Sequence, residues 1–128
     1  MERYPDPLIV RVDDLDLHEK PFALVKPFRF ISKVFGDQEI TAPENFRTDF
    51  ASVPRILHRV VSPVGRGYNR AAVIHDWLCV VSPKLCDSVT AAKIFLEAMQ
   101  YGGTPEVKAH LIFTNVVKFG PHFKAGDE

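Results

Sequence analysis

The stretch AAVIHDWLCVV, residues 71–81, decides the fold because it is apolar on every side except at two adjacent positions. His75 and Asp76 stand at its centre, about 100° apart around a helix axis. A surface helix would carry a polar face, so this pattern predicts a buried helix over residues 67–81 that stops at Ser82-Pro83. A buried imidazole or carboxylate without a partner is costly. Each side chain therefore needs a hydrogen-bond partner, a metal ion or a water-filled cleft.

The residues before this helix have the pattern of a small antiparallel sheet. Short apolar or alternating runs, separated by Pro, Gly and Asp, predict strands at 8–12, 22–25, 28–32 and 38–42. Turns are predicted at residues 35–37 and 42–46. Asn45 in the second turn stands where a left-handed backbone is tolerable.

Helical signals dominate after residue 54. A helix is predicted over residues 88–101, from an Asp87-Ser88 cap to Gly102-Gly103, and another from Thr104-Pro105-Glu106 to Phe119. A short helical turn is expected near residues 54–61. The fold class is therefore α+β: a small antiparallel sheet packed on a cluster of about three helices. We expect a single domain over residues 1–128, mostly β over 1–50 and mostly α over 54–120.

Composition excludes several classes of function. Sixteen basic and sixteen acidic residues cancel, without long runs of either sign, so nucleic acid is not an expected partner. The apolar segments are shorter than the roughly 18 residues that a membrane span needs, and no signal sequence is evident. We therefore expect a soluble protein made in a cytoplasm. Cys79 and Cys86 are too few for a disulfide framework and are expected to be reduced thiols.

A second group of polar residues, RTDFASVPR at 47–55, joins the two halves of the chain. Thr48, Asp49 and Ser52 can accept hydrogen bonds from backbone N–H groups, and Pro54 fixes the entry to the next helical turn. One interpretation is a capping and crossover loop between sheet and helices.

The alternative interpretation joins this loop to the central helix in a site. Asp49 would face His75 or Asp76 across the junction, and a carboxylate, an imidazole and a second carboxylate can orient a general base or hold a divalent cation. In the structural interpretation, the His-Asp pair instead ties its helix to backbone amides or to Arg55.

The ordered motifs resemble those of a known family. An APENF-like turn, TDFASVPR (48–55), YNRAAVIHDWL (68–78), AAKIFLEAM (91–99) and a final helix closing on KFG (118–120) are similar to domain of unknown function family 1353 (DUF1353), over about residues 22–123. The resemblance implies a small protein of tailed bacteriophages and prophages, and so a virion component, a lysis factor or a small host-directed enzyme.

Three positions depart from the family pattern. Asn45 stands where glycine is usual, and Cys79 where an aromatic residue follows HDWL. Ala92 stands where the family typically carries an acid, on the inward stripe with Phe95 and Ala98. The resemblance implies that such an acid would point at His75, so Ala92 removes the natural third member of a His-Asp site.

We favour a virion structural or assembly component of the tail, neck or baseplate region. Its motif residues lock the two halves together: Thr48, Ser52, Pro54, Arg55 and Trp77. Its partners would be other phage virion proteins or further copies of the chain, and no cofactor is expected. The protein would lie in the host cytoplasm during synthesis and afterwards in the virion.

The alternative is a small His/Asp-dependent hydrolase that acts on the host envelope. His75 would be the general base, Asp49 and Asp76 would orient it or hold a divalent cation, and Arg55 or Ser52 would help bind substrate. Secreted phospholipases A2 are similar in placing a His-Asp pair on a buried helix. The chain lacks their disulfides and glycine-rich calcium loop, and Ala92 replaces the acid on the facing helix.

Overall fold

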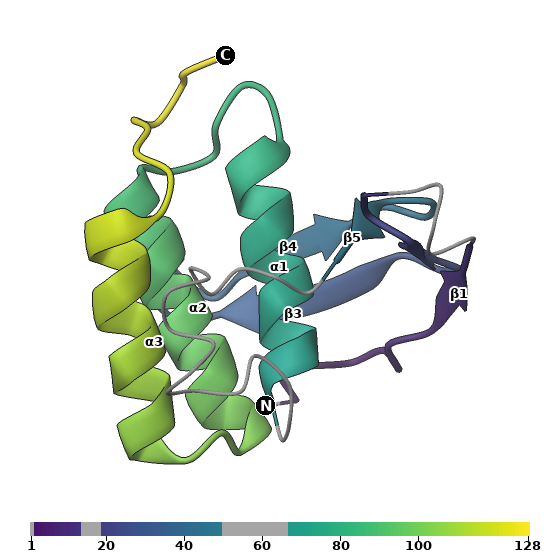
Figure 1. The fold of residues 1–128 in the computed structure, drawn as a ribbon, viewed down its shortest axis with the longest axis horizontal. Helices are drawn as coiled ribbons and strands as arrows, with labels where there is room; N and C mark the ends of the chain where they lie inside the picture. The colour runs from purple at the N-terminus through teal and green to yellow at the C-terminus, as the bar shows by residue number, and fades with distance from the viewer. Residues whose placement is uncertain (1, 14–18, 50–66) are drawn as a thin grey trace.

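The computed structural model describes residues 2–13, 19–49 and 67–128, and it has the α+β fold that the sequence predicts (Figure 1). The strands precede the helices along the chain. Their order is β1 (Val10–Val12), β2 (Phe22–Leu24), β3 (Phe28–Ser32), β4 (Gln38–Ala42), β5 (Arg47–Thr48), α1 (Tyr68–Val80), α2 (Ser88–Gly102) and α3 (Glu106–Phe119). The helical turn predicted at 54–61 lies outside the described residues.

The described strands form two antiparallel ladders. One has the order β1-β2-β5, and the other is the β3-β4 hairpin. In β3, burial alternates, so that Phe28, Phe30 and Ser32 point inward, as the period of two along a strand requires. The predicted turn after β3 is confirmed, since Gly36 and Asp37 both have positive φ.

Strand β5 is a feature that the sequence did not predict. It lies inside the stretch interpreted as a crossover loop, and its Thr48 pairs with Phe22 of β2. The turn before it is confirmed, because Asn45 has φ 69°. By pairing with β2, the first residues of this loop become part of the sheet, which fixes the position of Thr48.

Local capping signals explain the ends of α2. The carboxylate of Asp87 accepts a hydrogen bond from the N–H of Thr90 at 2.7 Å, and Gly103 closes the helix with φ 96°. Both ends agree with the sequence prediction. Helix α1 begins without a side-chain cap, at Gly67 with φ 80°.

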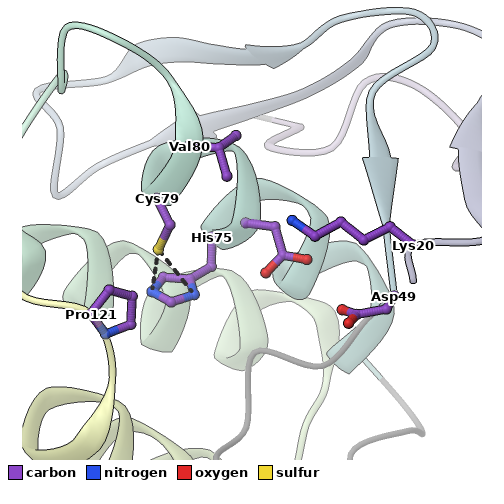
Figure 2. Close-up of a pocket in the computed structure, with 7 residues that line it drawn as sticks. Lys20, Asp49, His75, Cys79, Val80 and Pro121 are labelled. Carbon is purple, nitrogen blue, oxygen red and sulfur yellow. Dashed lines mark hydrogen bonds between the residues drawn. The ribbon is translucent and has the colours of Figure 1, made fainter. Parts of the chain in front are cut away.

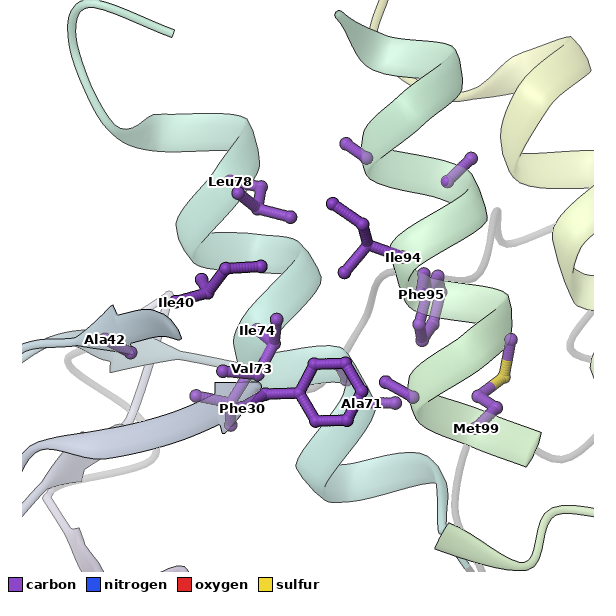
Figure 3. Packing of buried hydrophobic residues seen from close by; sticks show 14 of the residues in the cluster. Phe30, Ile40, Ala42, Ala71, Val73, Ile74, Leu78, Ile94, Phe95 and Met99 are labelled. Carbon is purple, nitrogen blue, oxygen red and sulfur yellow. The ribbon is translucent and has the colours of Figure 1, made fainter. Parts of the chain in front are cut away.

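Helix α1 packs between the β3-β4 hairpin and α2, and α3 packs on α2 (Figure 1). The side chains of Ile74 and Leu78 lie between Ile40 of β4 and Ile94 of α2 (Figure 3). Residues 71–74 of α1 are fully buried, as the sequence predicts, whereas Val80 at the C-terminal end of the helix is 44% exposed. This burial of apolar area is the main stabilising contribution to the fold.

The start of α1 touches the end of α2 through two glycines. A Cβ on Gly67 would lie 2.7 Å from Oγ1 of Thr104 and 2.8 Å from the carbonyl carbon of Gly102. A Cβ on Gly102 would lie 2.9 Å from Cα of Gly67. The helices therefore approach here at backbone distance, which sets the position of α1 and its His-Asp pair. None of the helices in the described part of the chain is long and apolar enough to span a membrane.

Candidate functional site

Asp76, the second residue of the His-Asp pair, connects α1 to β5. The hydroxyl of Thr48 donates a hydrogen bond to the carboxylate of Asp76. Next along the helix, the ring of Trp77 meets Phe46 edge-on, with 5.4 Å between the ring centroids and 79° between the planes. Because β5 and the turn before it hold Thr48 and Phe46, these two contacts fasten the strand half to the helical half.

His75 points instead toward α2. Its imidazole stacks on the ring of Phe95, with 4.6 Å between centroids and 13° between planes, and the residue is only 4% exposed. Its Nε2 and Nδ1 lie 3.6 and 3.9 Å from Sγ of Cys79, one turn further along α1. Burial lowers the pKa of His75 to about 4, so the ring is neutral near pH 7.

A pocket of about 240 Å³ opens beside the His-Asp pair (Figure 2). It has an enclosed floor at His75 and an exposed rim at Asp49 and Lys20. Figure 2 shows Lys20 and Asp49 reaching in from one side and Pro121 lying beside Cys79 on the other. The lining residues are Lys20, Asp49, His75, Asp76, Cys79, Val80 and Pro121. The structure thus brings together the three residues of the sequence-based cluster, Asp49, His75 and Asp76.

The thiol in this pocket is held in its protonated form. Burial, together with the charge of Asp76, raises the pKa of Cys79 to about 12. Since the thiolate is the nucleophilic form of cysteine, Cys79 is not prepared for nucleophilic chemistry. Cys79 and Cys86 are both free thiols, as the sequence predicts.

The imidazole can accept a proton, but it lacks the support that a catalytic histidine usually has. Among the described residues, the polar atom against the ring of His75 is Sγ of Cys79, which neither fixes a tautomer strongly nor stabilises an imidazolium. In the described ranges, His, Cys, Asp and Glu side chains form no group of three arranged to hold a metal ion. A divalent cation would rest on the carboxylates of Asp49 and Asp76 with water completing its shell.

Ala92 stands where the family resemblance implies an acid. It is fully buried on α2, three residues before Phe95, on the stripe that also includes Ala98 and Met99. Because Phe95 stacks on His75, this stripe faces α1 as expected. The α2 side chain that contacts the ring of His75 is thus the apolar ring of Phe95.

Three predicted motif residues, Ser52, Pro54 and Arg55, lie outside the described part of the chain. Four pocket residues were not in the predicted site: Lys20, Cys79, Val80 and Pro121. Cys79 follows His75 by four positions, a spacing that places both side chains on one helix face, so this residue had a sequence signal. Lys20 and Pro121 enter from distant segments and had none.

The fold and the site define a small α+β domain whose central helix carries a His-Asp pair beside a pocket. The chain belongs to the family described as protein of unknown function DUF1353, which it matches over residues 22–116. It is 40% identical over 78 residues to the uncharacterized protein y4iH of Sinorhizobium fredii. The match covers 60% of this chain and 32% of that relative, so the chain spans about a third of the relative's length. No solved structure shows significant similarity.

Proposed function

We propose that the chain is a structural or assembly component of a bacteriophage or prophage particle, in its tail, neck or baseplate region. The proposal rests on the contacts that the HDWL motif, residues 75–78, makes inside the fold. His75 stacks on α2, Asp76 bonds to β5, Trp77 contacts the turn before β5, and Leu78 lies in the core. These four consecutive side chains of α1 thus contact α2, β5, the turn before β5 and the core. We call this set of contacts the structural joint.

The chemistry of His75 supports the same proposal. A general base works best with a pKa near the working pH and with a partner that orients the ring. The pKa of His75 is about 4, and its described polar contact is a thiol. The ring is therefore better suited to packing against Phe95 than to moving protons.

The phage setting of the proposal rests on the resemblance of TDFASVPR and HDWL to phage proteins. The partners would be other virion proteins or further copies of this chain. The protein would be synthesised in the host cytoplasm and then built into the particle. Such a protein would need no cofactor.

The test is the fate of the chain during particle assembly. Particles are purified on a density gradient from lysates of a bacterium that produces the chain from its native genomic position, and the bands are analysed by quantitative mass spectrometry. A virion component stays with the particle band at a fixed ratio to the major structural proteins. A chain found only among free proteins contradicts the proposal.

One observation favours a second candidate, a small hydrolase acting on the host envelope: Asp49, His75 and Asp76 line the same pocket. His75 would take a proton from water, and the two carboxylates would orient the reacting groups or hold a divalent cation. The test is release of fatty acid from phospholipid vesicles by the purified chain, with calcium and with EDTA.

Matched variants make that second test specific. A hydrolase loses its activity in His75→Phe, which keeps a ring against Phe95, and in Asp49→Asn. It keeps its activity in His110→Gln, because His110 is exposed on α3. The absence of fatty acid release from the wild-type chain under both conditions excludes a phospholipase.

A further inference from the structure

We call residues 120–128, which follow α3, the strap. The strap lies against the loop between α1 and α2 (Figure 1). The N–H of Lys84 in this loop donates to the carbonyl of Asp127 at 2.7 Å, and the N–H of Gly126 donates to the carbonyl of Lys84 at 2.8 Å. The strap lies beyond the family match, which ends at residue 116. Through these two bonds the strap pairs with the loop between α1 and α2.

The side chain of Lys84 fastens the strap to the end of α1. Its Nζ donates to the carbonyl oxygen of Cys79, in the last turn of α1, at 2.8 Å and to that of the C-cap residue Val81 at 3.3 Å. Carbonyls at the end of a helix lack helical partners. The same ammonium lies 5.3 Å from the centroid of the Phe123 ring. One cation thus connects the strap to the helix that carries His75.

The first part of the strap forms a wall of the pocket. Pro121 lines the pocket together with His75 and Cys79, and Figure 2 shows its ring beside the side chains of both. Movement of the strap away from the loop would take Pro121 with it. The edge of the imidazole, now almost fully buried, would then face solvent, and the partly exposed Cys79 would become more accessible.

The strap is held by one half-buried side chain, that of Phe123, which packs on the core, and by the N–H of Ser88, which donates to the carbonyl of Phe123 at 2.9 Å. The other side chains of the strap are exposed. Segments of this kind open locally without unfolding the domain. We propose that the strap is a gate: closed, it walls off the floor of the His75 pocket, and released from Lys84, it admits small molecules to that floor. This inference holds for either of the two candidate functions.

Gly126 allows the gate to be loosened without touching the pocket. It has φ 84°, and a Cβ at this position would meet nothing within 4 Å. Gly126→Ala therefore destabilises the turn of the closed strap, because alanine disfavours positive φ, and it introduces no clash. In this turn the N–H of Asp127 donates to the carbonyl of Lys124 at 3.1 Å. Gly36→Ala is the matched control, because Gly36 has φ 71°, is equally open and lies in the distant β3-β4 turn.

The measurement is the rate at which iodoacetamide alkylates Cys79 in the folded full-length chain, followed by mass spectrometry of the peptide that contains it. A gate predicts a rate about fivefold or more above wild type in Gly126→Ala and an unchanged rate in Gly36→Ala. A wild-type rate in Gly126→Ala overturns the proposal. An equal increase in both variants also overturns it, because Cys79 would then be reached through general unfolding.

A second pair of variants tests the role of Lys84. Lys84→Met removes the ammonium and keeps the length of the side chain, so a gate predicts faster alkylation of Cys79. Lys118→Met is its control, since Lys118 also lies 5.3 Å from a phenylalanine ring, that of Phe119, outside the strap. Equal rates in the two variants would mean that Lys84 does not fasten the gate.

Discussion

Thr48 of β5 donates its hydroxyl hydrogen to the carboxylate of Asp76 in α1, although the two residues are 28 positions apart in sequence. This bond crosses the junction between the strand half and the helical half. Beside it, Trp77 packs on Phe46. The polar residue that looked misplaced in an apolar helix is thus one end of a connection between the two halves.

The burial of His75 makes stability depend on pH. Its pKa is about 4 in the folded chain, against 6.5 for an ordinary histidine, so the unfolded chain binds the proton more tightly between these values. The contribution of the neutral ring is fully present above about pH 6.5 and is lost as the pH falls toward 4. We expect a loss of about 3 kcal/mol from this group, measured by denaturant unfolding at a series of pH values.

Two variants separate this effect from other titrations. His75→Phe keeps an aromatic ring against Phe95 and should flatten the pH dependence between pH 4 and 6.5. His110→Gln, on the exposed face of α3, should retain it. A wild-type slope in His75→Phe would show that other groups cause the loss.

The contact between the ends of α1 and α2 should not tolerate a methyl group. In Gly67→Ala, the new Cβ would have to displace the backbone at Gly102 as well as adopt a positive φ. We expect a loss of free energy of unfolding clearly greater than the roughly 1–2 kcal/mol for the left-handed conformation alone. Gly36→Ala, with positive φ and open space, supplies that reference. Equal losses in the two variants would mean that the helices can move apart without cost.

Glu97 of α2 holds the β3-β4 turn through three donors. Its carboxylate accepts from Oγ of Ser32 and the N–H of Lys33, both at 2.7 Å, and from the N–H of Val34 at 3.4 Å. Glu97→Gln replaces one acceptor oxygen with a donor, so we expect a loss of about 1–3 kcal/mol and faster amide hydrogen exchange at Lys33. Denaturant unfolding and NMR exchange measure the two effects.

The control for this variant is Glu106→Gln. Glu106 is exposed and pairs with His110 one turn along α3. Its replacement should change stability by less than about 0.5 kcal/mol and leave the exchange of Lys33 unaltered. Similar exchange rates at Lys33 in the two variants would contradict the role of Glu97.

The sequence predicts the features that depend on neighbouring residues. Asp87 and Gly103 specify the ends of α2, Asn45 specifies a left-handed turn, and the apolar run around His75 specifies a buried helix. The strand β5 and the bonds of Glu97 to residues 32–34 depend on segments distant in the sequence, for which local patterns contain no information.

The candidate site shows the same division. Asp49, His75 and Asp76 were predicted because each is a charged or titratable group next to apolar residues. Lys20 and Pro121 complete the pocket from opposite ends of the chain, and their sequence surroundings are those of ordinary loops. Their place in the pocket follows only from how the sheet and the strap pack around α1.

The most direct test of HDWL as a structural joint is a double-mutant cycle between Thr48 and Asp76. The free energies of unfolding of wild type, Thr48→Val, Asp76→Asn and the double variant are measured in denaturant at pH 7. If the bond joins the two halves, we expect a coupling energy of about 1.5–3 kcal/mol, the usual contribution of a hydrogen bond to a charged group. A coupling energy near zero, with each single variant as stable as wild type, would contradict it.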